Sequence, residues 1–117
     1  MLDWTKEVPY SITVCDAEGK ILDMNDKAVE TFIPKGNPSI IGNNVMDCHP
    51  EHARKKIENL MKDKNINAYT IEKNGVKKLV YQAPWYKDGE FMGLVELSLV
   101  LPDNMPHYVR TPKPAKQ

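Results

Sequence analysis

The first third of the chain alternates apolar and polar residues in two short runs separated by a turn. Ile12 and Val14 alternate with polar neighbours, and Ile21 and Met24 follow beyond an Asp-Ala-Glu-Gly segment. Alternation with a period of two is typical of a strand that is buried on one face. The glycine of the intervening segment supplies the positive φ that a tight turn often needs. The pattern therefore predicts a β-hairpin over residues 10–25.

Two helices are predicted in the middle of the chain, where the apolar spacing changes to three and four. Asn25 stands in the position of an N-cap before residues 26–33, and the prolines and glycines of residues 34–44 end that helix. A second helix is predicted over residues 50–64, with Pro50 in its first turn. Its single apolar stripe consists of Ala53, Ile57, Leu60 and Met61.

The pattern changes back to alternation in the last third of the folded region. Residues 67–73 read as a short strand, and the Asn74-Gly75 pair that follows is a strong two-residue hairpin signal. Residues 76–87 and 91–101 then alternate on either side of a second turn. Together with the first hairpin, these runs predict an α+β fold with a five-stranded antiparallel sheet and helices packed on one face.

The apolar side of this sheet is expected to be its buried side. In the last strand, the apolar residues fall on one face, while Glu96 and Ser98 fall on the other. We expect a common buried face beneath Phe32 and Ile57. It would consist of Val14, Leu79, Tyr81, Val95 and Leu97.

Length, charge and cysteine content limit the class of protein. The chain has 117 residues, enough for one hydrophobic core, and its 16 basic residues balance 16 acidic residues. Neither charge collects into a long block, so no nucleic-acid partner is expected. Cys15 and Cys48 do not make a disulfide framework, and no stretch reaches the ~18 apolar residues of a membrane span. We expect a cytoplasmic protein with no membrane partner.

The chain is expected to divide into three parts. Residues 1–7 form an N-terminal flanking segment, residues 8–101 form the domain, and residues 102–117 form a tail whose prolines prevent regular structure.

The segment PYSITVCDAEGKILDMNDKAVETF resembles the opening hairpin and first helix of the PAS domain family, and GEFMGLVELSLVL is similar to its closing strands. Four residues fall at the family's spacing, namely Asp16, Gly19, Ile21 and the capping Asn25. The resemblance covers about residues 8–101. It implies a sensory or protein-interaction module whose curved sheet and helical lid enclose a small-molecule pocket or a dry core, and it does not imply an enzyme.

Cys48, His49 and His52 lie within five positions at the start of the second helix. A c-type haem needs two cysteines before the histidine, and a zinc finger needs paired ligands, so neither pattern is present. With Pro50 at the first helical position, His49 falls at the N-cap, which is the structural interpretation. Two alternatives stay open: His49 contacts a ligand, haem or metal, or Cys48 is a reactive thiolate at a helix N-terminus.

The sequence therefore predicts a single-domain PAS sensory or signal-transduction module that binds a small ligand, a partner protein, or both, and has no output domain of its own. A haem- or metal-binding redox or gas sensor using His49 is one alternative, and a small enzyme dependent on Cys48 and His49 is another. No catalytic residue and no metal ligand is assigned. The ligand is unidentified, and a small apolar or aromatic molecule and haem both remain candidates. The candidate pocket residues are Phe32, Ile41, Val45, Cys48, His49, Ile57, Leu60, Tyr69, Tyr81, Ala83, Val95 and Leu97.

Leu2, Trp4 and Val8 precede the first predicted strand, where little core is available to cover them. Burial of such an apolar patch against another surface contributes roughly 25 cal/mol per Å². We therefore expect a homodimer that acts through an unidentified signalling partner.

Overall fold

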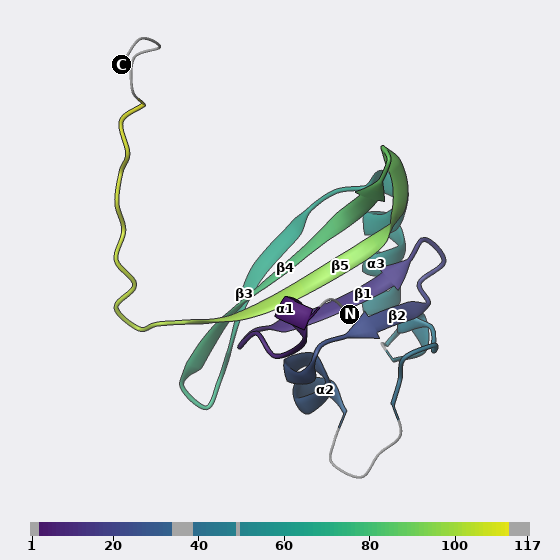
Figure 1. Cartoon of the computed structure of the whole chain (residues 1–117), viewed down its shortest axis with the longest axis horizontal. Helices are drawn as coiled ribbons and strands as arrows, with labels where there is room; N and C mark the ends of the chain where they lie inside the picture. The colour runs from purple at the N-terminus through teal and green to yellow at the C-terminus, as the bar shows by residue number, and fades with distance from the viewer. Residues whose placement is uncertain (1–2, 34–38, 49, 113–117) are drawn as a thin grey trace.

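The computed structural model describes residues 3–33, 39–48 and 50–112, and for Asp47 and Cys48 it describes the backbone alone. An antiparallel sheet forms the body of the molecule (Figure 1). Its five strands are β1 (Ser11–Asp16), β2 (Ile21–Met24), β3 (Asn67–Lys73), β4 (Val76–Lys87) and β5 (Glu90–Leu101). They lie in the order β2-β1-β5-β4-β3, so the last strand is the centre of the sheet. The predicted α+β architecture is confirmed.

The turns between the last three strands have the conformation that their residues favour. Asn74 and Gly75 have φ angles of 53° and 77°, as a two-residue Asn-Gly hairpin requires. Asp88 and Gly89 repeat this arrangement with φ angles of 52° and 80°. Tight turns fix the strand register, and the register decides which side chains share a face.

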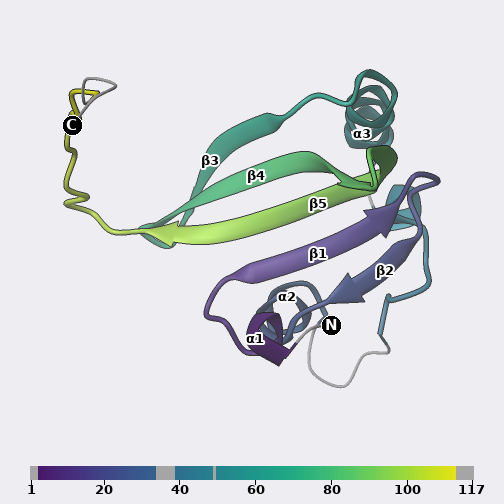
Figure 2. The same ribbon diagram turned by 45° about the horizontal axis from the view of Figure 1, so that its top comes forward.

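The helical elements divide between the two sides of the sheet (Figure 1 and Figure 2). They are α1 (Asp3–Lys6), α2 (Asp26–Phe32), the 3₁₀ turn η1 (Val45–Cys48) and α3 (Glu51–Asp63). In Figure 1, α1 lies in front of β1 and β5, whereas α3 lies behind the sheet. We call the side toward α2 and α3 the inner face and the opposite side the outer face.

The N-terminus of α3 differs from the prediction. Pro50 is itself the N-cap, with an extended ψ of 162°, and its carbonyl accepts hydrogen bonds from the backbone N–H groups of Ala53 and Arg54 at 3.0 and 2.9 Å. The interpretation of His49 as the N-cap is therefore wrong. Proline fixes φ but leaves ψ free, so the sequence did not determine whether Pro50 would precede the helix or begin it. His49 lies outside the described residues.

Asn25 confirms its predicted role as the N-cap of α2 and also joins three segments. Its Oδ1 accepts from the backbone N–H groups of Ala28 and Ile12, both at 3.0 Å. Its Nδ2 donates to the carbonyls of Thr5 at 3.0 Å and Tyr10 at 2.8 Å. Four hydrogen bonds satisfy this side chain, which is only 1% exposed, so α1, β1 and α2 are held around one amide.

Two clusters of buried apolar residues fill the inner side of the molecule. The first joins α3 to the sheet and consists of Cys15, Ile57, Met61 and Leu94. The second joins α2 to β2 and consists of Ile21, Met24, Ala28 and Ile33. Val45 of η1 packs against both clusters, so this short turn connects the two helices.

The strand register places the predicted apolar face on the outer side. Leu97 pairs with both Ile12 and Tyr81, and Val95 pairs with Val14 and Ala83. These residues do share a face, but α3 packs on the alternate residues, Cys15 and Leu94. The expectation that Val14, Leu79, Tyr81, Val95 and Leu97 lie buried beneath Phe32 and Ile57 is therefore wrong. Alternation determines which residues share a face, but it does not determine which face the helices cover.

Gly93 allows β5 and β1 to approach each other closely. A Cβ at this position would overlap the backbone of Cys15 and Asp16, and the φ of 148° is one that side chains disfavour. On β4, Trp85 pairs with Gly93 and donates from Nε1 to the carbonyl of Cys15 at 2.9 Å. The glycine therefore opens the space across which Trp85 bridges to β1.

Residues 102–112 leave the sheet beyond β5 and contain no helix or strand (Figure 1). Met105, Tyr108 and Val109 are exposed there. Among the described residues, no helix is long and apolar enough to span a membrane.

Candidate functional site

Three adjoining hollows lie between the inner face of the sheet and the helical layer. Their volumes are about 40, 160 and 250 Å³, and Glu96 lines all three. The smallest shares Thr13, Ile21 and Val45 with the largest, and it shares Ile57 and Gln82 with the middle one. We call these three hollows together the inner cavity.

Four polar side chains cross the floor of the inner cavity. Thr13 of β1 pairs with Glu96 of β5, Glu96 pairs with Gln82 of β4, and Gln82 pairs with Asn67 of β3. Directly paired residues of an antiparallel sheet project from the same face, with Cβ atoms about 4.5–5.5 Å apart. Thr13, Glu96, Gln82 and Asn67 therefore form one continuous line across four strands, which we call the polar row.

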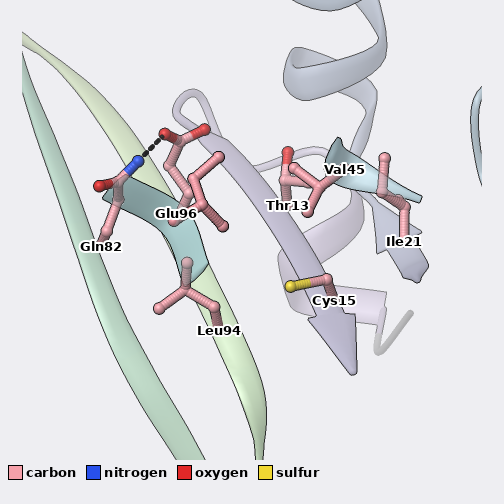
Figure 3. A pocket seen from close by; sticks show the side chains of 8 residues that line it. Thr13, Cys15, Ile21, Val45, Gln82, Leu94 and Glu96 are labelled. Atoms are coloured by element: carbon pink, nitrogen blue, oxygen red, sulfur yellow. Dashed lines mark hydrogen bonds between the residues drawn. The ribbon is translucent and has the colours of Figure 1, made fainter. Parts of the chain in front are cut away.

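Hydrogen bonds orient most of the polar row. Asn67 donates from Nδ2 to Oε1 of Gln82 at 2.8 Å. Gln82 donates from Nε2 to Oε1 of Glu96 at 2.9 Å, which is the bond drawn in Figure 3. Both donors point toward β5, so the chain of amides ends on the Glu96 carboxylate. Among the described residues, Gln82 is the hydrogen-bond donor to that carboxylate.

Thr13 lies at the other end of the polar row. Its Oγ1 is buried and has no hydrogen-bond partner among the described residues. Thr13 lines two of the three hollows, including the largest. A buried polar atom without a partner is uncommon in folded proteins, because desolvation is then uncompensated.

Apolar side chains make the walls above the polar row. Those of the largest hollow come from β2, α2 and the segment before α3. They are Ile21, Met24, Phe32, Ile40 and Val45. Leu94 closes the smallest hollow from the sheet (Figure 3), and Ile57 closes it from α3.

Two titratable groups of the cavity stay protonated at neutral pH. Cys15 is a free cysteine, and burial raises the pKa of its thiol. Burial also raises the pKa of the Tyr69 phenol, and the negative charge of Glu96 adds to this shift. Above the Tyr69 ring, the Lys56 ammonium lies 5.7 Å from the ring centroid, a cation–π contact at the rim.

The structure gathers only part of the predicted pocket. Four predicted residues line the inner cavity: Phe32, Val45, Ile57 and Tyr69. Leu60 is buried on α3 but lines none of the three hollows, and Ile41 is exposed in the loop before η1. The remaining strand residues project from the outer face, away from the cavity. They are Tyr81, Ala83, Val95 and Leu97.

The Cys48 side chain and His49 lie outside the described residues, so the alternatives of a ligand, haem or metal contact by His49 and of a reactive Cys48 rest on the sequence. His52, the other histidine of this segment, is exposed on α3. Among the described residues, no group of three or more His, Cys, Asp or Glu side chains is placed to hold a metal ion.

Sequence reasoning missed the polar row. The signal was an acid in the middle of the last strand, with apolar residues on both sides of it along the chain. Once that strand is known to be central, an acid there must have neighbours on two sides. Alternation alone, however, assigns Glu96 to the polar face without indicating that helices cover that face.

No family model matches the chain, and no curated protein matches it. Solved structures do resemble it. A C-terminal domain from Streptococcus mutans has a TM-score of 0.66 at 23% identity, over 83% of this chain and 79% of that one. The PAS domain of BvgS from Bordetella pertussis has a TM-score of 0.63 at 16% identity, over 86% and 83%. A sensory box sensor histidine kinase from Vibrio cholerae has a TM-score of 0.61 at 11% identity, over 86% and 88%. At identities this low, the likeness shows the fold alone.

Proposed function

We propose that this chain, which has the fold of a PAS domain, is a sensory module that binds a small ligand in the inner cavity. The observation that carries the proposal is the polar row beneath apolar walls. Pockets for small molecules measure about 300–1,000 Å³ and combine an apolar lining with a few placed polar groups. The inner cavity has this composition, and its three hollows together fall in this size range.

Binding, rather than catalysis, is the role that the cavity favours. A cysteine nucleophile needs a lowered pKa or an adjacent base, whereas burial raises the pKa of the Cys15 thiol. The hydrogen bonds of the polar row join amides to one carboxylate and leave no pair of groups arranged as acid and base. The row is suited to recognising the polar end of a ligand.

Helix α3 is the element that would report occupancy. It contacts the sheet through Ile57 and Met61, which pack against Cys15 and Leu94, and Ile57 also lines the cavity. A ligand between Ile57 and the polar row would move α3 relative to β5. A partner protein that contacts α3 would then read this displacement.

We also propose that the chain forms a homodimer through the outer face. The middle of that face is apolar across β1, β5 and β4. The 12-residue strands β4 and β5 are each roughly 40 Å long and the six-residue β1 is roughly 20 Å long, which at about 5 Å per strand gives ~500 Å². A standard interface buries about 800 Å² per partner, so this face supplies most of that area. Helix α1, which contains the 68% exposed Trp4, lies in front of the same side in Figure 1.

Native mass spectrometry of the full chain, purified gently from cells, tests the sensory role. We expect a bound small molecule in the wild type and its loss in Val45→Phe, because Val45 borders two of the hollows and a ring there would project into them. Val109→Phe, the same change on the exposed tail, is the matched control and should keep the ligand. A wild type without bound ligand that also captures none from a cell extract would contradict the proposal.

A further inference from the structure

The charge inside the inner cavity is unevenly placed. Among the described residues that line the smallest and largest hollows, Glu96 is the only charged one. Lys56 lines only the middle hollow, together with Glu96, and its ammonium lies over the Tyr69 ring there. The two hollows shared by Thr13 and Val45 therefore contain a carboxylate and no lysine or arginine from the described chain.

The hydrogen bonds of the polar row leave Glu96 as an acceptor with spare capacity. An ionised carboxylate can accept about four hydrogen bonds, and among the described residues Glu96 accepts one, from Gln82. Gln82 itself is held in place, because its carbonyl accepts from Asn67. The amide therefore cannot turn its carbonyl toward the cavity without losing both bonds, and the row offers a ligand an acceptor.

Thr13 adds a second contact on the far side of Glu96. It is the direct cross-strand neighbour of Glu96, opposite Gln82, and its buried hydroxyl has no partner in the described part of the chain. A hydroxyl can rotate to donate or accept, so it can pair with a polar group that sits on Glu96. The same ligand group would then satisfy both residues.

From this arrangement we infer that the ligand carries a cationic nitrogen group, an amine or an amidine, on an apolar body. The inference rests on the proposed function of the inner cavity. Glu96 would accept the N–H groups, Thr13 would take a further one, and the apolar body would fill the largest hollow against Met24 and Val45. A ligand with a carboxylate or phosphate at this point would instead face Glu96 with like charge, which is unfavourable in a partly desolvated cavity.

Three probes of nearly the same shape test the charge preference: benzamidine, benzamide and benzoate. Binding to the full chain is measured by calorimetry, and the side-chain NH₂ signals of Gln82 and Asn67 are followed by NMR to locate the site. We expect benzamidine to bind at least about tenfold more tightly than benzamide, because hydrogen bonds between charged groups are roughly twice as strong as neutral ones. Benzoate should bind no better than benzamide.

Glu96→Gln and Glu90→Gln form the matched pair of variants. Glu96→Gln keeps the shape of the side chain and an oxygen for Gln82, so it should fold and should reduce benzamidine binding to the level of benzamide. Glu90→Gln removes the same charge from the exposed start of β5 and should leave binding unchanged. A benzamidine affinity that survives Glu96→Gln, or a preference for benzoate, would overturn the inference while the cavity stays a ligand site.

If none of the three probes binds, the chemical identity of the molecule that co-purifies with the wild type tests the inference. A co-purified molecule with a basic nitrogen that is lost in Glu96→Gln and kept in Glu90→Gln would support the inference, and one without a basic nitrogen would overturn it. If no probe binds and no molecule co-purifies, the proposed sensory role fails together with the ligand class.

Discussion

Replacing Thr13 by valine should stabilise the ligand-free protein. The exchange puts a methyl group where the hydroxyl was and leaves the shape of the side chain almost unchanged. In the wild type, Oγ1 is buried and has no partner among the described residues, so folding removes its water without returning a hydrogen bond. Both residues are β-branched, so the strand conformation of β1 is retained.

The magnitude follows from the cost of that unpaired group. Leaving a buried hydroxyl unsatisfied costs about 1–3 kcal/mol. We therefore expect the free energy of unfolding to rise by roughly 1–2 kcal/mol. For a domain of this size, that corresponds to a rise in Tm of about 5–10 °C.

Urea denaturation of ligand-free protein is the suitable assay, because an unchanged m-value would show that the denatured state is unaltered. Thr70→Val is the matched control. Thr70 lies on β3 and is exposed, so the same exchange there should change the free energy of unfolding by no more than about 0.5 kcal/mol.

Two results would refute the reasoning. A loss of stability in Thr13→Val would mean that the hydroxyl has a partner in the ligand-free protein, such as a bound water. An equal gain in Thr70→Val would assign the effect to strand propensity instead of the unpaired hydroxyl.

Three further predictions concern the sheet. Gly93→Ala should destabilise the protein by about 3 kcal/mol or more, because the added Cβ overlaps the carbonyl of Cys15. Thermal melting measures this, and a loss below about 1 kcal/mol would contradict the close approach of β5 to β1. Burial raises the pKa of Cys15 above its ordinary value of 9.0, so the unfolded chain releases the thiol proton first as pH rises. Stability should therefore fall above pH 9.0, and Cys15→Ala should reduce that fall in unfolding experiments; equal pH dependence in both proteins would count against the shift. Leu97→Lys on the outer face should give a monomer by light scattering, while Val109→Lys on the tail should not; a wild type that is monomeric at tens of micromolar would refute the dimer.

The sequence determined most of the local structure of this chain, apart from the residue that caps α3. The Asn74-Gly75 pair gives a two-residue turn because both residues tolerate positive φ, and Asn25 caps α2 because its oxygen replaces a missing backbone acceptor. The number of strands and the antiparallel pairing within each hairpin follow from the apolar spacing and the turn residues. These are interactions between near neighbours, so the order of the residues is sufficient to specify them.

The tertiary structure alone decided the order of the strands and the use of their two faces. The sequence indicated that Glu96 and Val95 point in opposite directions, but not that β5 would lie between β1 and β4 with helices over its polar side. The usual rule expects helices on the apolar side because burial of apolar area stabilises a fold. Here the helices cover a cavity, whose floor tolerates polar side chains that pair with one another.

The polar row could not be foreseen for the same reason. Thr13 and Asn67 are far apart in the chain, and they come into one line only when three strand registers are fixed together. Each register depends on a pairing between distant segments, which no local pattern encodes. The sequence thus set the elements and their turns, while the packing of distant strands created the inner cavity and placed Glu96 at its centre.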